Sequence, residues 1–146
     1  MDDYLALGGL LEGYVANGMA GSPVKQLTAM GEIENIALRG HLICIAFAGE
    51  SVAISHSPDT AVIVQRWLTI VSVQTTGKAL DATVPLAKAG PLLWRLGKLV
   101  QGQQFPGYKP LVRVTPPPPR LLDNFAHFPL AWETSFIFVG DGQIMS

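Results

Sequence analysis

The chain has 146 residues, and we expect a single domain over 1–146 that is large enough to bury a core. Hydrophobic residues make up 49% and charged residues only 14%, against about 25% charged residues in an average soluble domain. So few charges favour a surface partly covered by further copies of the chain, although an apolar monomer with many small surface residues is the alternative. The net charge of −1 and the scattered Lys and Arg residues argue against tight nucleic-acid binding.

The compartment is indicated by the first residues and by the cysteine. The start at Met1-Asp2-Asp3 is acidic, where a secretory signal peptide would be basic. No apolar run approaches the roughly 20 residues that span a bilayer, so we expect no membrane segment. Cys44 lies in the apolar run 42–47, and a lone buried thiol fits a reducing compartment and an inert core position. We therefore expect synthesis in the cytosol.

The N-terminal segment predicts a helix over 2–19, because an apolar stripe recurs at helical spacing at Leu7, Leu10, Leu11 and Val15. Gly8, Gly9 and Gly13 weaken this helix by about 1 kcal/mol each, so we expect tertiary or subunit contacts to hold it. Residues 24–30 read as a short strand. Residues 31–39 are ambiguous and fit a helical turn.

The middle of the chain is rich in β-branched residues. Residues 41–48 are apolar on both faces and predict a central strand. Residues 49–51 predict a turn, after which 52–55 would form the second strand of a hairpin. Ser57-Pro58-Asp59 is another turn signal. The run 60–75 predicts the longest strand so far.

The last part of the chain begins with the main helix, predicted over 84–102. Pro91 either kinks this helix or marks its first position. Residues 111–115 predict a strand, and the four prolines of 116–119 predict a stiff connector that cannot pair in a sheet. The final strand, 126–138, has a period of two that places large apolar side chains on one face: Phe128, Leu130, Trp132, Phe136 and Phe138.

The order of these elements predicts the fold class. A helix, a group of strands, a second helix and further strands are typical of an α+β domain. We expect an antiparallel or mixed sheet of three or four strands, with an N-terminal helix and one main helix packed on a face. The two long strands, 60–75 and 125–139, are expected to be neighbours in the sheet.

Chemistry-bearing residues do not form a recognisable site. The three histidines, at positions 41, 56 and 127, have neither the helical i, i+4 spacing nor the neighbouring ligands of a metal site. Ser55, His56 and Asp59 are adjacent in sequence, but a catalytic triad needs groups from different elements, so a polar turn is the better interpretation. We predict no catalytic, cofactor-binding or metal-binding residue, and no enzyme.

Three further motifs have structural interpretations. The glycines at 8–9 and 18–21 do not match a phosphate loop and indicate chain flexibility. The prolines of 116–119 could serve as a ligand for an SH3-like domain, but strands on both sides favour a connector. Trp67, Trp94 and Trp132 are expected to fill the core or a subunit interface rather than to stack on bases or sugars.

The second half of the chain resembles a known family. The segments that carry the resemblance are GPLLWRL at 90–96, FPGYKPL at 105–111, VRV at 112–114 and FAHFPLAWET at 125–134, with QRWLTI at 65–70 upstream. Together they resemble the Mu-like prophage family of small phage tail proteins regarded as tail terminators. The resemblance covers 41–139, is strongest over 90–135 and is weakest over 1–40. The chain departs from the family in having Gln-Gln-Phe at 103–105 where Gly-Trp is typical.

The resemblance implies a structural virion protein with a tail-terminator-like α+β fold. Such proteins form a hexameric ring on the tail tube, stop tail elongation and join the tail to the neck and head. It further implies three protein partners: the tail tube protein, a neck or stopper protein and, in contractile phages, the sheath protein. DNA would pass through the lumen of this homo-oligomer without specific binding. The protein would be found in the tail or neck of the virion, and in the host cytoplasm during assembly.

Candidate interface segments are the N-terminal region, the turn at 49–59 and the tail at 140–146, because they flank β-rich runs and have no core pattern of their own. Open sheet edges could pair across subunits. Two alternatives to a tail terminator remain. One is another phage connector, such as a head–tail stopper or a tube protein. The other is a small-molecule-binding α+β domain, for which the last strand offers only His127 and Glu133 off its apolar face.

Overall fold

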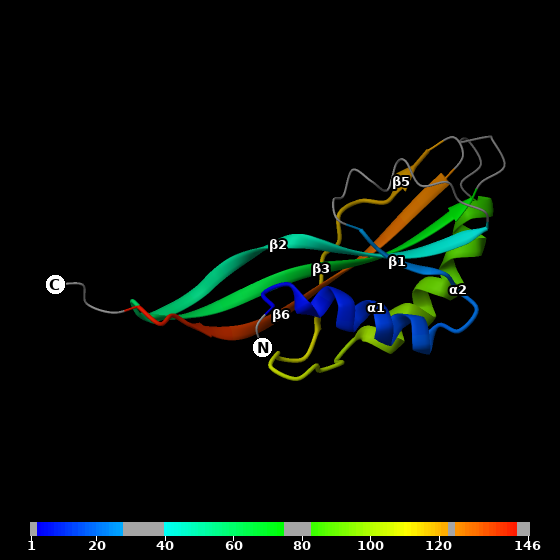
Figure 1. Cartoon of the computed structure of the whole chain (residues 1–146). Helices are drawn as coiled ribbons and strands as arrows, with labels where there is room; N and C mark the ends of the chain where they lie inside the picture. Colours follow the sequence, from blue (N-terminus) through cyan, green and yellow to red (C-terminus); the bar gives the residue numbers. More distant parts are fainter. Residues whose placement is uncertain (1–2, 28–39, 75–82, 123–124, 143–146) are drawn as a thin grey trace.

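The structure is a computed structural model that describes residues 3–27, 40–74, 83–122 and 125–142. It confirms the α+β class: α1 (Ala6–Gly18) and α2 (Thr83–Val100) pack against the same face of a mixed sheet (Figure 1). The described residues contribute six strands rather than the three or four expected. The strands are β1 (Val24–Leu27), β2 (His41–Ser57), β3 (Thr60–Gln74), β4 (Val112–Val114), β5 (Arg120–Leu121) and β6 (Phe125–Val139).

The sheet has the order β1-β2-β3-β6-β4, and β5 also pairs with β6. β1 runs parallel to β2, whereas the other pairs are antiparallel. The predicted pairing of the two long strands is confirmed, because β3 and β6 keep one register from Thr60 opposite Val139 to Gln74 opposite Phe125. Trp67 lies opposite Trp132 in this ladder, in the middle of the sheet.

The hairpin predicted around residues 49–51 is wrong. β2 is a single strand of 17 residues whose register against β3 shifts between Phe47 and Glu50. Gly49 adopts a positive φ of 106°, a conformation that side chains larger than glycine rarely take. A glycine of this kind permits a β-bulge, which twists a strand without reversing it. The real turn follows at Ser57-Pro58-Asp59, as predicted.

The main core lies between the two helices and the sheet. The even-numbered face of β6 points into it, as the period of two predicts, and Phe128, Leu130 and Trp132 are buried there. The helices contribute Leu7, Leu11, Val15, Ala89, Leu96 and Val100 to the same core. The other face of the sheet holds a second, smaller apolar cluster formed by Leu27, Cys44, Ala46, Leu68, Ile70 and Ala131.

Both predicted helices are present. α1 ends at Gly18, and its stripe is buried except for Leu10, which is 43% exposed. α2 begins at Thr83 and runs through Pro91, so the interpretation that the helix starts at this proline is wrong. Pro91 is exposed, and its ring therefore meets solvent instead of a packed neighbour.

The remaining connections largely follow prediction. The strand predicted over 24–30 is described as far as Leu27, and the helical turn predicted over 31–39 lies outside the described residues. The turn at 105–107 is closed by the amide of Tyr108, which donates to the Phe105 carbonyl at 3.1 Å. The prolines of 116–119 form no strand and link β4 to β5, which was not predicted because it has only two residues. None of the described helices is long and apolar enough to cross a membrane.

The three long strands extend well past α1 as a projecting ribbon, which points to the left in Figure 1. We call this ribbon the arm and define it as residues 49–64 and 135–142. At its root, the Tyr4 ring packs edge-on against Phe136 and Phe138 at 5.4 and 5.5 Å between ring centroids. At its tip, the Gly140 amide donates to the Asp59 carbonyl at 2.6 Å. The arm is therefore an ordered part of the sheet.

Candidate interaction surfaces

The residues that most resemble catalytic groups have structural partners. His41 Nε2 lies 2.9 Å from Ser22 Oγ, where it joins β2 to the segment before β1. His127 is buried, and its Nδ1 lies 2.6 Å from Ser72 Oγ on the neighbouring strand. Within the described parts of the chain, no group of three or more His, Cys, Asp or Glu side chains could hold a metal ion.

The sequence cluster Ser55, His56 and Asp59 is described only in part, because the side chains of the first two lie outside the described residues. Asp59 Oδ1 accepts a hydrogen bond from Ser57 Oγ at 2.5 Å, and a second from Thr60 Oγ1 at 3.3 Å. These bonds lower the pKa of the Asp59 carboxyl, because they stabilise its charged form. Asp59 thus closes the turn between β2 and β3.

Cys44 is fully buried in the cluster on the sheet face away from the helices. Burial raises the pKa of its thiol to about 11, while the nearby Lys25 lowers it by a smaller amount. Only the thiolate is an effective nucleophile. The predicted placement of this thiol in the core is confirmed, and its environment disfavours reaction.

The three tryptophans separate into two kinds. Trp67 and Trp132 are 1% and 0% exposed and lie in the core, whereas Trp94 is 69% exposed. The Trp132 Nε1–H donates to Thr69 Oγ1 at 2.9 Å, so its polar atom is satisfied inside the sheet. The core interpretation holds for the two strand residues. Of the three tryptophans, Trp94 alone leaves most of its surface in contact with solvent.

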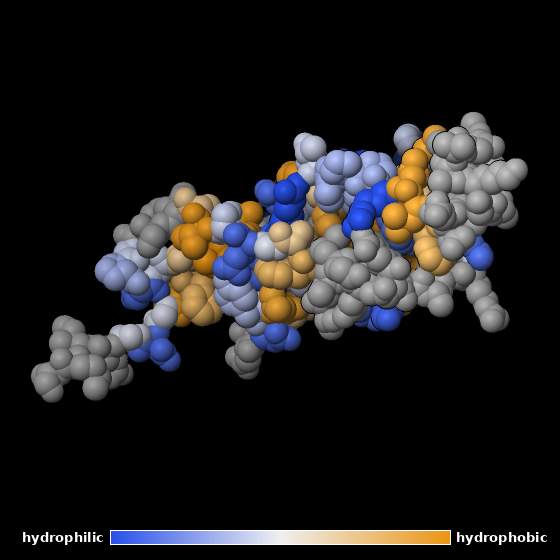
Figure 2. Space-filling model, turned by 90° about the horizontal axis from the view of Figure 1, so that it is seen from above, coloured by the Kyte–Doolittle hydropathy of each residue, from blue (hydrophilic) through white to orange (hydrophobic). Residues whose placement is uncertain are grey.

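The arm presents apolar side chains to solvent. Exposed fractions are 59% for Val52, 67% for Ile137, 50% for Phe138 and 62% for Val139. Figure 2 shows apolar residues gathered along this part of the molecule, interrupted by polar ones. Exposed apolar side chains grouped on one projecting element, rather than scattered singly, are typical of an interaction surface.

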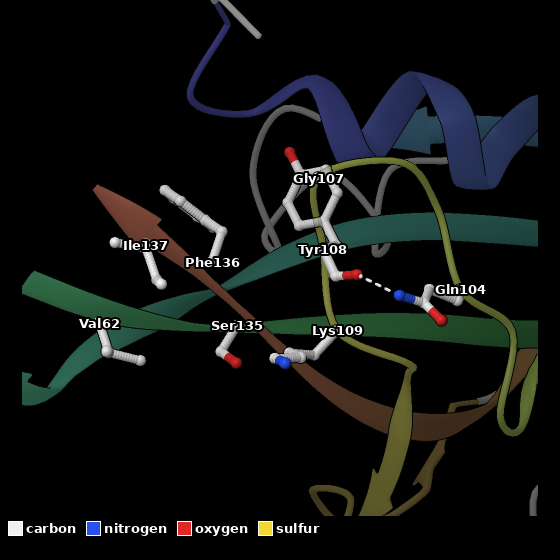
Figure 3. A pocket seen from close by; sticks show the side chains of 8 residues that line it. All are labelled: Val62, Gln104, Gly107, Tyr108, Lys109, Ser135, Phe136 and Ile137. Atoms are coloured by element: carbon white, nitrogen blue, oxygen red, sulfur yellow. Dashed lines mark hydrogen bonds between the residues drawn. The ribbon is translucent and has the colours of Figure 1, made fainter. Parts of the chain in front are cut away.

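A groove of about 480 Å³ lies at the root of the arm, between the loop that follows α2 and the end of β6 (Figure 3). The Lys109 amide donates to the Ser135 carbonyl at 2.9 Å, and Gln104 Nε2 donates to the Tyr108 carbonyl at 3.1 Å. These bonds fix the loop against β6. The groove is lined by Val62, Gln104, Gly107, Tyr108, Lys109, Ser135, Phe136 and Ile137.

A second groove, of about 390 Å³, lies between α2 and β4, and we call it the α2–β4 groove. Lys98 Nζ lies 5.0 Å from the centroid of the Trp94 ring, a distance suited to a cation–π interaction. Across the groove, the Arg113 guanidinium carbon lies 6.0 Å from the centroid of the buried Trp132 ring. The groove is lined by Leu93, Trp94, Gly97, Lys98, Gln101 and Arg113.

Two segments of the chain each carry charges of a single sign, which the description of Lys and Arg as scattered missed. Between 83 and 122 there is no Asp or Glu, and all charged residues are basic: Lys88, Arg95, Lys98, Lys109, Arg113 and Arg120. The arm has no Lys or Arg, and its charged residues are Glu50, Asp59 and Asp141. A count of charges by segment, rather than a search for clusters, could have found this signal.

The three predicted interface segments either contact the arm or form part of it. In the N-terminal region, Tyr4 Oη donates to Glu50 Oε2 at 2.7 Å. Residues 49–59 belong to the arm itself, and the tail is described as far as residue 142. Their role as interfaces stays a prediction. His127 and Glu133, the polar pair suggested for a small-molecule site, line neither groove.

Comparisons with known proteins give no further indication of function. No protein-family model matches the chain, and no curated protein is significantly similar to it in sequence.

Proposed function

We propose that the chain is a structural protein of a phage virion, namely a tail terminator that forms a closed ring on the tail tube. The ring, expected to be a hexamer, would stop tail elongation and join the tail to the neck. The proposal rests on the resemblance over 41–139 and on the α+β fold, which agrees with the architecture expected for the family. A structural role of this kind requires no catalytic site.

The observation that carries the proposal most directly is the arm. The arm leaves apolar surface in water, because Ile137, Phe138 and Val139 are half or more exposed. Exposing apolar surface costs a free energy of about 25 cal/mol for each Å². Covering this surface with a partner recovers that free energy. The low share of charged residues points the same way.

A ring also explains how growth ends. A contact between two different patches, repeated around an axis, closes on itself when the rotation allows it. A ring with one face complementary to the tube and a different opposite face ends polymerisation. The arm and the body of this chain are unlike surfaces, as a contact of this kind requires.

The test is the mass of the purified full chain by light scattering over a range of concentrations, followed by negative-stain imaging. A closed ring of about six copies is the expected result. Open tubes would instead assign the chain to the tube proteins. A monomer at every concentration would remove the argument from the exposed arm and favour the small-molecule-binding alternative.

A further inference from the structure

The α2–β4 groove has the character of a docking surface for a partner that is both apolar and acidic. Trp94 leaves 69% of its surface in water at one wall. Lys98 and Arg113 bring two positive charges to the same groove, and none of the residues that line it is acidic. Tryptophan and arginine are among the residues that contribute most to binding at protein interfaces.

The arm has the complementary character. Its apolar side chains include Ile137 and Val139, which are 67% and 62% exposed. Its charged residues are all acidic, and two of them, Asp59 and Asp141, lie at the tip beside the bond between the Gly140 amide and the Asp59 carbonyl. An apolar ribbon with acidic ends matches an aromatic groove with basic walls in both hydrophobicity and charge.

We propose that the arm of one copy docks into the α2–β4 groove of the next copy. This inference rests on the proposed function, because it names the contact between unlike patches by which the ring would close. The arm points away from α2 of its own chain (Figure 1), so the contact joins different copies. Each copy offers one arm and one groove, and head-to-tail contacts then run around the ring.

The geometry of β2 favours docking through side chains over pairing of sheet edges. The register of β2 against β3 shifts at three places, between Phe47 and Glu50, between Val52 and Ile54, and between Ser55 and Ser57. Such bulges disturb the regular row of amides and carbonyls that an added strand needs. The open edge of β2 is therefore a poor template for a further strand.

Trp94 provides a direct reporter of this contact, because it is 69% exposed, whereas Trp67 and Trp132 are already buried. We expect the tryptophan emission of the full chain to shift to shorter wavelength as the concentration rises and the particle mass increases. Trp94→Phe should abolish the shift. Because the contact includes charge pairs, about 0.5 M salt should move assembly to higher concentration.

Charge reversal tests the pairing itself. The first variant carries Lys98→Glu with Arg113→Glu, and the second carries Asp59→Lys with Asp141→Lys. We expect each alone to assemble roughly tenfold or more weakly, and the two to assemble together when mixed, because opposite charges then meet again. Lys25→Glu, a reversal on an exposed residue of β1, is the matched control. Thermal melting shows whether each variant is folded, which matters for Asp59 because its side chain closes a turn.

The outcomes separate this inference from the proposed function. Rings that form equally well from both reversed variants would overturn arm-to-groove docking and leave the ring intact. Open filaments that need both sets of charges would support the docking and contradict the tail terminator. A wild-type monomer at every concentration would overturn the docking. So would tight binding of short duplex DNA that Lys98→Glu with Arg113→Glu abolishes, since the groove would then serve nucleic acid.

Discussion

At the scale of single residues, packing decides how closely the elements approach one another. Gly8 lies where α1 meets the sheet, and a Cβ atom there would lie 3.0 Å from the ring of Trp67. Gly9 faces open space, with no atom within 4 Å of an added Cβ. Two adjacent glycines thus have different roles, and the prediction of simple flexibility is wrong for the first. The bulge at Gly49 and the buried thiol of Cys44 are further cases in which one residue sets a local property.

Gly8→Ala is expected to destabilise the protein by about 1–3 kcal/mol, because the rigid indole of Trp67 must move to admit the methyl group. Gly9→Ala is expected to stabilise it by about 0.5–1 kcal/mol, because alanine favours the helix and meets nothing. Urea unfolding of the two variants and the wild type measures both changes. Effects of the same sign would contradict the close approach of α1 to the sheet.

Cys44 predicts an alkaline loss of stability. Its thiol has a pKa of about 11 in the fold, against a usual value of 9.0, so the folded chain holds this proton more tightly than the unfolded chain. The raised pKa of this thiol contributes to the free energy of unfolding. That contribution is complete below about pH 9 and is lost as the pH rises through about 11. Cys44→Ala should therefore show a smaller loss of unfolding free energy between about pH 8 and pH 10.5.

The comparison isolates the thiol because Tyr4, whose pKa is raised to about 12 by burial and by Glu50, is present in both proteins. Equal pH dependence in the wild type and the variant would show that the thiol is not the group responsible.

At the scale of elements, hydrophobic periodicity in the sequence predicts where helices and strands lie. It does not predict where each element ends or where it is irregular. α2 carries a proline in its interior, which removes one helical hydrogen bond. The packing of Ala89, Leu96 and Val100 against the sheet offsets this loss. β2 continues through a segment that reads as a turn, since its partner β3 holds both halves in one ladder.

Pro91→Ala is expected to stabilise the protein by about 1–3 kcal/mol, because the missing amide is restored and the position is exposed. Gly90→Ala, at the preceding exposed position with no atom within 4 Å of an added Cβ, is the control and should gain at most about 1 kcal/mol. Chemical unfolding measures both changes. A loss of stability in Pro91→Ala would mean that the proline sets a bend that the packing of α2 requires.

At the scale of the whole molecule, the protein has a body with a helix-covered sheet and an arm that the helices do not cover. Side chains in the body, such as Ile43, Val71 and Trp132, are fully buried, whereas those at the end of β6 are half or more exposed. The two parts also differ in charge: the charged residues of the arm are all acidic, and those between 83 and 122 are all basic. Both differences are consistent with a chain that buries the apolar surface of its arm by assembly with other copies.

This division predicts the pattern of amide hydrogen exchange. In the dilute protein, amides paired between β3 and β6 around Trp67 and Trp132 should exchange most slowly, and those of the arm faster, because local stability follows buried contact. After assembly, the arm and the C-terminal half of α2 should both become protected. Protection of the arm without α2 would place its partner elsewhere on the neighbouring copy.

The sequence by itself determined the α+β class, both helices and the strands β3 and β6, because hydrophobic periodicity is a local signal that burial enforces. The pairing of β3 with β6 was an expectation from their length that the structure confirmed. The sequence also contained the two segments with charges of a single sign, which a count by segment would have revealed. Only the tertiary structure decided that β1 runs parallel to β2, that residues 49–51 continue a strand, and that Trp94 faces solvent while Trp67 and Trp132 do not. Hydrophobic periodicity predicts which residues share a face of a helix or strand. Contacts between residues distant in sequence determine which faces other elements bury and how far each strand extends beyond the helices.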